Sequence, residues 1–362
     1  MRMMTGLCAN QHIEAMIANG HILAEPQIDP SQIQPASLDL RLGTIAYRMR
    51  TSALTGANAT VKEALSDFIM HTVDLSAGAV LERGCVYLIP LVERLALPAT
   101  VTGVANAKSS SGRLDLLTRT IVDYGTEFDR IPAGYSGAVY VEVCPRSFSI
   151  LVRPGLQLNQ LRFRNGQSQL SDAELRKLHA SETLVSGEAI IEDGLGFAVD
   201  LSATESKLIG YRAKPHTGVI DLDQLDYYEP AEYWEALYCT DDYLILDPEA
   251  FYILVSKEAV HIPPDFAAEM APYLAMVGEF RVHYAGFFDP GFGHDLAGGR
   301  GSRAVLEVRC REVPFVLNHG QIVGRLLYER LAERPTLLYG RDLGSNYQGQ
   351  GLKLSKQFKR PL

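Results

Sequence analysis

The residues best suited to chemistry in this chain lie in one short run, Asn106-Ala107-Lys108-Ser109-Ser110-Ser111-Gly112-Arg113. Its hydroxyls, backbone N–H groups and two cations are the groups that bind a polyanion such as a triphosphate. It is not a Walker A loop, because no glycine directly precedes the lysine and no helix pattern follows. The same residue types are compatible with a solvated serine-rich turn.

Two glutamates stand in apolar, strand-like segments. Glu142 follows Val-Tyr-Val, and Glu307 follows Ala-Val-Leu. Burial would raise the pKa of such a carboxyl toward the range useful for general acid–base catalysis. The alternative is a solvent-facing glutamate on a half-exposed strand.

A third candidate is the segment 285–293, in which Asp289-Pro290-Gly291 predicts a turn within a β-hairpin. Its small first residues would admit a flat ring against the backbone. The matching segment 129–137 has Pro132 where the later one has Asp289. The tail at 339–351 is rich in glycine and glutamine, which is typical of disorder or of a segment that orders over a ligand.

These candidates fall at matching places in two halves of the chain. Leu81–Ile89 resembles Leu246–Leu254, and Glu142 matches Glu307 at the same offset, 307 − 142 = 165. A repeat this long indicates two similar domains in tandem and not a solenoid. We expect the domains at 1–165 and 196–330, a linker with a short helix at 166–195, and a C-terminal lid or tail at 331–362.

Within each half the pattern is mostly that of β-strands. Runs of Val, Ile, Leu and Tyr recur roughly every 8–12 residues between glycine and proline turns. This spacing predicts a small antiparallel barrel or sandwich in each half. Helical patterns are few and fall at 9–19, 59–69, 171–180 and 229–237.

Composition narrows the functional classes. The net charge of −9 argues against nucleic-acid binding. No apolar run approaches the ~18 residues of a membrane span, and no signal-peptide core is present, so a cytoplasmic protein without a membrane partner is expected. The five cysteines lack C-x-x-C spacing, which argues against a structural zinc site. His12-Ile13-Glu14 fits half of a zinc-deaminase motif, but no P-C-x-x-C follows.

Taken together, these segments resemble the dCTP deaminase branch of the dUTPase-like superfamily. Ala107–Arg113 is similar to its triphosphate loop, 285–293 to its nucleoside hairpin, and Tyr347–Gly351 to its C-terminal lid. The resemblance covers residues 35–165 and 196–362. It implies a mainly β fold of two tandem, distorted dUTPase-like β-barrel or jelly-roll domains with a few short helices.

The resemblance implies hydrolytic deamination of dCTP to dUTP and ammonia. This reaction would supply dUTP and dUMP for thymidylate synthesis. Members use Mg²⁺ on the substrate triphosphate and no zinc, and a glutamate is the acid–base. The implied catalytic residues are Glu307, Glu142, Ser109 and Arg113. The implied substrate-binding residues are Lys108, Ser109, Ser110, Ser111, Gly112, Arg113, Ala285, Asp289, Val305, Leu306, Tyr339, Tyr347 and Gln350.

Each half departs from the family pattern in a complementary way. The first half has the phosphate loop but carries Phe128 and Pro132 in its hairpin. The second has Asp289 and Glu307, with residues 270–278 lacking Lys, Ser and Arg where the loop belongs. Because loop and hairpin come from different subunits in homotrimeric members, we expect one composite site, within a chain or between chains of a homo-oligomer. The alternatives are a dUTPase, a bifunctional enzyme that converts dCTP to dUMP, and a non-catalytic nucleotide-binding regulator.

Overall fold

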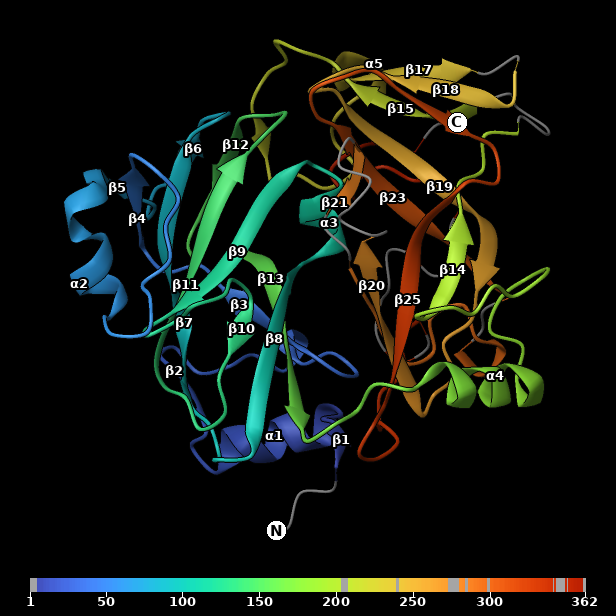
Figure 1. The fold of residues 1–362 in the computed structure, drawn as a ribbon. Helices are drawn as coiled ribbons and strands as arrows, with labels where there is room; N and C mark the ends of the chain where they lie inside the picture. The colour runs from blue at the N-terminus through green and yellow to red at the C-terminus, as the bar shows by residue number, and fades with distance from the viewer. Residues whose placement is uncertain are drawn as a thin grey trace. The chain divides into compact units, whose positions relative to one another are not determined.

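A computed structural model describes residues 5–202, 208–238, 241–272, 280–283, 286–297, 300–340, 342, 349 and 351–360. The chain divides into two compact units (Figure 1). Unit 1 comprises Met1–Ser168, Gly218–Gln224 and Leu331–Thr336, and unit 2 comprises Gln169–Thr217, Leu225–Arg330 and Leu337–Leu362. Unit 1 therefore contains two segments from late in the chain, a feature that the sequence pattern does not reveal.

Unit 1 is built from three sheets. The largest has the order β5-β4-β7-β11-β9, formed by Ile69–Asp74, Ile45–Met49, Val86–Ala96, Ser136–Pro145 and Leu116–Val122, and β2 (Ile22–Ala24) also pairs with β7. The second has the order β1-β13-β8-β10, formed by Gly6–Leu7, Gln157–Asn165, Val101–Ala107 and Arg130–Ile131, with β3 (Leu38–Arg41) on β13. The third has the order β16-β12-β6, formed by Ile220–Asp221, Ile150–Val152 and Ala79–Leu81.

Strand β11 shows how sequence alternation sets the two faces of the largest sheet. Val139, Val141 and Val143 are fully buried in the body of unit 1. Alternation places Tyr140 and Glu142 on the opposite face. There, α2 (Val61–Leu65) and the 3₁₀ turn η2 (Ser66–Phe68) supply apolar side chains to a second, smaller cluster. The segment 50–68, called the insert here, carries these helices and thus covers the Glu142 face.

The described residues of unit 2 form three sheets. The first sheet has the order β17-β15-β19-β23-β21, and its strands are Trp234–Tyr238, Leu208–Ala213, Phe251–Val260, Ser302–Cys310 and Phe280–His283. The second sheet has the order β14-β25-β20-β22, and its strands are Leu195–Ala198, Ile322–Arg330, Phe266–Pro272 and Phe287–Phe288. The last sheet pairs β18 (Tyr243–Leu246) with β24 (Phe315–Asn318). In both units the strand with the candidate glutamate is internal to its sheet.

The described helices are short: α1 (Asn10–Ala18), α2, α3 (Ser109–Gly112), α4 (Asp172–Ser181) and α5 (Pro230–Tyr233), with 3₁₀ turns at Pro30–Gln32, Ser66–Phe68 and Asp295–Ala297. In the described part of the chain, none of them is long and apolar enough to cross a membrane. The predicted mainly β fold is confirmed.

Two local predictions were wrong. The helical pattern at 229–237 is helical only over α5, because Trp234–Tyr238 joins β15 as an antiparallel strand, and strand pairing prevails over helix propensity. The run at 106–113, predicted to be a loop, contains the one-turn helix α3. That turn is closed by Gly112 N and Arg113 N, which donate to Lys108 O and Ser109 O at 3.0 Å each.

Candidate active site

The serine-rich loop leaves the end of β8 and turns at once into α3. Lys108 N donates to Leu158 O at 2.9 Å, which fixes the start of the turn against β13. The Ser111 hydroxyl is buried and donates to the same carbonyl at 3.0 Å. Ser109 and Ser110 are only half-buried. The loop therefore directs one serine into the body of unit 1 and keeps two nearer its surface.

The two cations of the loop sit in different surroundings. Lys108 Nζ is bonded to the carboxylate of Asp39 on β3 and lies 3.2 Å from Gln157 Oε1. The lysine thereby ties the loop to two strands, and a buried carboxylate balances its charge. The Arg113 side chain at the end of α3 is itself buried. Both cations are therefore held within unit 1, Lys108 by an ion pair and Arg113 by burial.

Glu142 lies in a closed polar network. Its Oε1 accepts from Arg119 Nε and from the Ser52 hydroxyl at 3.1 Å each, and also from Arg119 Nη2. Arg119 Nη2 donates to the Ser52 hydroxyl as well, at 2.7 Å. The Arg119 guanidinium lies over the Phe128 ring, with Cζ 4.0 Å from the ring centroid. The carboxylate is thus held by an ion pair on the covered face of the sheet.

The hairpin of unit 1 contains a strongly perturbed carboxyl group. Asp129 precedes β10 in a left-handed conformation with φ +62°. Its Oδ1 accepts from Thr120 N at 2.7 Å. Burial raises the pKa of Asp129 to about 7, against the opposing effects of the Thr120 hydrogen bonds and of Arg119 and Arg130.

The hairpin of unit 2 is closely packed around Asp289. Phe292 N donates to Asp289 O at 3.0 Å and closes the turn, and the Asp289 side chain is buried. Gly293 has φ +68°, and a Cβ there would lie 2.1 Å from Val260 O, so only glycine fits. Tyr339 N donates to Pro290 O at 3.0 Å, and its ring centroid is 5.7 Å from that of Phe292. The structure thus brings Asp289 and Tyr339, two residues predicted for the site, together in unit 2.

Strand β23 carries Val305, Leu306 and Glu307. Leu306 is fully buried in the hydrophobic core of unit 2, whereas Val305 and Glu307 share the other face of the strand. Across the ladder, the Cα partners of Glu307 are Ile253 and His283. In unit 1, the Cα partners of Glu142 are Leu88 and Arg119. Arg119 is thus a ladder neighbour of Glu142, and His283 is the corresponding neighbour of Glu307.

The remaining predicted site residues are not all described. Ala285, Tyr347 and Gln350 lie outside the described residues. The loop residues Lys108 to Arg113 belong to unit 1, and Asp289, Val305, Leu306, Glu307 and Tyr339 belong to unit 2.

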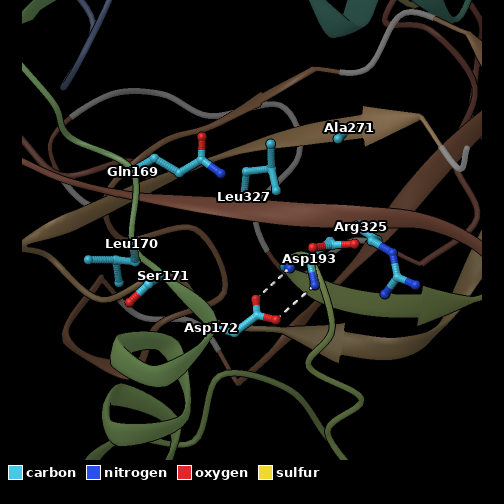
Figure 2. Close-up of a pocket in the computed structure, with 9 residues that line it drawn as sticks. Gln169, Leu170, Ser171, Asp172, Asp193, Ala271, Arg325 and Leu327 are labelled. Carbon is cyan, nitrogen blue, oxygen red and sulfur yellow. Dashed lines mark hydrogen bonds between the residues drawn. The ribbon is translucent and has the colours of Figure 1, made fainter.

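A separate cavity of about 580 Å³ opens in unit 2 at the start of α4 (Figure 2). Its lining residues are Gln169, Leu170, Ser171, Asp172, Asp193, Gly194, Ala271, Arg325 and Leu327. Asp172 accepts from Asp193 N and Gly194 N at 2.9 Å each, so its carboxylate joins α4 to the following loop. No predicted site residue lines this cavity, and its two carboxylates disfavour a triphosphate there.

Two family models match consecutive parts of the chain. The 2'-deoxycytidine 5'-triphosphate deaminase (DCD) N-terminal domain matches residues 4–167, and the C-terminal domain of the same family matches residues 171–358. The chain belongs to the 2'-deoxycytidine 5'-triphosphate deaminase family. Membership in this deaminase family makes it a hydrolytic enzyme and confirms the resemblance drawn from the sequence.

Individual members of the deaminase family agree with this assignment. The crystal structure of 2'-deoxycytidine 5'-triphosphate deaminase from Agrobacterium tumefaciens is 54% identical, with a TM-score of 0.90, over 94% of this chain and 100% of that one. The "dCTP deaminase, dUMP-forming" of Salinispora arenicola is 30% identical over 43% of this chain and 77% of its own length. The "dCTP deaminase" of Haloarcula marismortui is 28% identical over 41% of this chain and 74% of its own length. The last two match less than half of this deaminase, as expected if it contains their domain twice.

Sequence reasoning missed the partners that hold the site residues of this deaminase. Arg119 and Ser52 around Glu142, and Gln157 beside Lys108, were not singled out. Arg119 gives one usable signal, because it is a charged residue inside the strand-forming run Leu-Leu-Thr-Arg-Thr-Ile-Val. Ser52 gives none, since it lies 90 positions before Glu142.

Proposed function

We propose that this chain hydrolyses dCTP to dUTP and ammonia. The observation that carries the proposal is the match of both halves to the deaminase family, together with a preorganised loop of hydroxyls and cations in unit 1. In the reaction, water adds to C4 of the cytosine ring, a proton passes to the ring, and ammonia leaves with a second proton. Relatives named for dCTP support this substrate.

Glu307 is the proposed acid–base of this reaction. Glu142 is engaged by Arg119 and Ser52 on the face of its sheet that α2 covers. Glu307 lies in unit 2 together with Asp289 and Tyr339, the residues proposed for the nucleoside side, and we assign it the family role of the strand glutamate. Glu307 takes a proton from the attacking water and passes it to N3 of the ring, and it then takes the remaining hydroxyl proton and passes it to the leaving amine.

The nucleotide site is proposed to be composite. Ser109 holds the attacking water, and Lys108, Ser110, Ser111, Gly112 and Arg113 form the phosphate side. Asp289 and Tyr339 form the nucleoside side with Ala285, Val305, Leu306, Tyr347 and Gln350. Leu306 would contact the base only through its backbone, because its side chain lies in the core. The two sides meet within one chain or between chains of a homo-oligomer.

Magnesium is proposed to enter as part of the substrate. Phosphate oxygens are hard ligands that suit Mg²⁺, and the hydroxyls and cations of the loop suit the remaining charge of a metal–triphosphate. Zinc takes no part in the proposed mechanism. Turnover should depend on the ratio of Mg²⁺ to dCTP, and activity lost with EDTA should return with Mg²⁺ alone.

One experiment separates this function from its alternatives. The protein is incubated with Mg²⁺ and either dCTP or dUTP, and ammonia and pyrophosphate are measured. We expect ammonia from dCTP, with dUTP as the co-product. Pyrophosphate from dUTP without ammonia from dCTP would indicate a dUTPase, and nucleotide binding without turnover would indicate a regulator.

A bifunctional enzyme is the second candidate, because the Salinispora arenicola relative is named dUMP-forming. Pyrophosphate in equal amount to ammonia, with dUMP as the product of dCTP, would establish it.

A further inference from the structure

The hairpins of the two units pair with equivalent strands in the same register. Ile131 on β10 is the ladder partner of Gly103 on β8, and Phe288 on β22 is the ladder partner of Ala268 on β20. Gly103 and Ala268 are separated by the repeat offset, 268 − 103 = 165. Ile131 is therefore the structural counterpart of Phe288, and the residues that precede these two can be compared by counting back along the sequence.

Counting back three residues pairs Phe128 with Ala285, so the first hairpin has a large aromatic side chain where the second has a methyl group. In unit 1, Phe128 packs against the smaller apolar cluster beneath α2. That cluster lies on the Glu142 face of the largest sheet, together with Tyr140. The Phe128 ring therefore fills space beside the strand glutamate of unit 1.

The Arg119 guanidinium fills the space between this ring and Glu142. Its Cζ lies 4.0 Å from the centroid of the Phe128 ring, and its Nε and Nη2 both donate to Glu142 Oε1. Ser52 of the insert donates to the same oxygen at 3.1 Å. A flat cation thus lies on an aromatic ring and turns an N–C–N edge toward the glutamate. The reacting edge of cytosine has the same N–C–N atoms and becomes an amidinium when N3 is protonated.

The insert is hydrogen-bonded to the segment that leads into this hairpin. Thr55 is buried, and its Oγ1 accepts from Gly125 N at 2.8 Å. Tyr124 N donates to Ala59 O at 2.9 Å. The cover over the Glu142 face is therefore bonded to the chain beneath it and not only packed against it.

We propose that Arg119 and Phe128 occupy, in unit 1, the place that the cytosine base takes in unit 2. This inference rests on the proposed function, because that function places the base against Glu307. Unit 1 then takes no nucleoside of its own, and each chain binds one nucleotide. The place beside Glu142 is an amidinium site that is filled by a side chain of the protein itself.

A free ion of the same chemistry should replace this internal occupant. Arg119→Ala removes the guanidinium and leaves the Glu142 carboxylate facing the vacated space. The Arg119 side chain is 27% exposed, so a small ion can enter from solvent. Guanidinium and acetamidinium ions carry the N–C–N edge, whereas methylammonium does not.

The first test measures the melting temperature of Arg119→Ala in different salts. In about 10 mM guanidinium chloride this variant should melt about 3 °C higher than in the same concentration of sodium chloride. Acetamidinium chloride should act in the same way, and methylammonium chloride should give no rise. The double variant Arg119→Ala with Glu142→Gln lacks the carboxylate and should show no rise in any of these salts.

Arg50→Ala is the matched control for the first test. The Arg50 guanidinium also lies over a ring, with Cζ 5.5 Å from the centroid of Phe68, but it donates to a backbone carbonyl, Asp67 O, at 3.2 Å. Guanidinium should not raise the melting temperature of this variant. No rise in Arg119→Ala, or an equal rise in Arg50→Ala or the double variant, overturns the proposal.

The second test counts bound nucleotides in a chain with an unchanged unit 1, so it stands even if Arg119→Ala fails to fold. Glu307→Gln is dialysed to equilibrium with Mg²⁺ and labelled dCTP, because its slow turnover preserves the substrate. We expect one dCTP per chain at saturation, and two per chain overturns the proposal. No bound dCTP, or a wild-type protein that releases no ammonia from dCTP, contradicts the proposed function instead.

Discussion

Arg119 and Glu142 face each other directly across two neighbouring strands. They are Cα partners in the β9–β11 ladder, and Arg119 Nε donates to Glu142 Oε1 at 3.1 Å. Ser52, from the insert that covers this face, completes the network. Glu142 is therefore held by an ion pair inside unit 1, and the ladder neighbour of Glu307 at the equivalent position of unit 2 is His283.

This relationship predicts different roles for the two glutamates. Glu307→Gln should lower kcat about a thousandfold, the usual size of a general acid–base contribution. Glu142→Gln should keep kcat within a few-fold and lower the melting temperature, because it weakens the ion pair with Arg119. Steady-state ammonia release and thermal unfolding measure both. Loss of turnover in Glu142→Gln alone would refute the composite site.

The Asp129 carboxyl predicts a pH-dependent stability. Burial raises its pKa in the folded state to about 7 from 3.8, so the folded chain binds this proton more tightly than the unfolded chain. The resulting stabilisation is complete below about pH 4 and is lost as the pH rises through about 7. Asp129→Asn keeps an acceptor for Thr120 N and suits a positive φ.

Asp129→Asn should therefore melt several degrees above the wild type at pH 8 and close to it at pH 4. Thermal unfolding at both pH values checks this, with Asp74→Asn on the surface as control. If the melting temperatures of Asp129→Asn and the wild type differ by the same amount at both pH values, Asp129 does not titrate as expected.

The loop serines should separate binding from stability. Ser111→Ala removes a buried hydrogen bond to Leu158 O and should cost about 1 kcal/mol of stability. Ser110→Ala should raise the KM for dCTP more than Ser111→Ala does, because the Ser110 side chain is only half-buried whereas the Ser111 hydroxyl already donates to a backbone carbonyl. If Ser111→Ala affects KM more than Ser110→Ala does, the phosphate side of the site has been misassigned.

Arg153 should control the local order of residues 218–224. Its guanidinium binds Asp221 through Nη1 at 2.7 Å and Nη2 at 3.0 Å, and Nη1 also lies 2.7 Å from Asp223 Oδ2. This bidentate pair stabilises β16 against β12. Arg153→Ala should speed proteolysis near these residues while changing the melting temperature little, because the pair is partly exposed. Arg153→Lys should show an intermediate rate.

The sequence correctly predicted the elements that depend on short-range patterns. Alternation and turn residues predicted the strands that carry Glu142 and Glu307. The helical pattern at 171–180 predicted α4, where Ser171 and Glu174 form a capping box. Helix α3 was missed because one turn is too short to show a period. Strand β17 was missed because it depends on pairing with β15, which lies before α5 in the chain and is not indicated by any local pattern. The Arg119–Glu142–Ser52 network depends on strand register and on a distant insert, which no local pattern encodes.

The short strand β16 determines where the chain can be divided. It comes from the second half of the sequence, yet it pairs with β12 in unit 1 and is held there by Arg153. A gene cut after residue 168 would encode a first half that lacks this strand and leaves Arg153 without its carboxylates. Unit 1 is therefore not encoded by one continuous stretch of the chain, and no single break in the sequence separates it from unit 2.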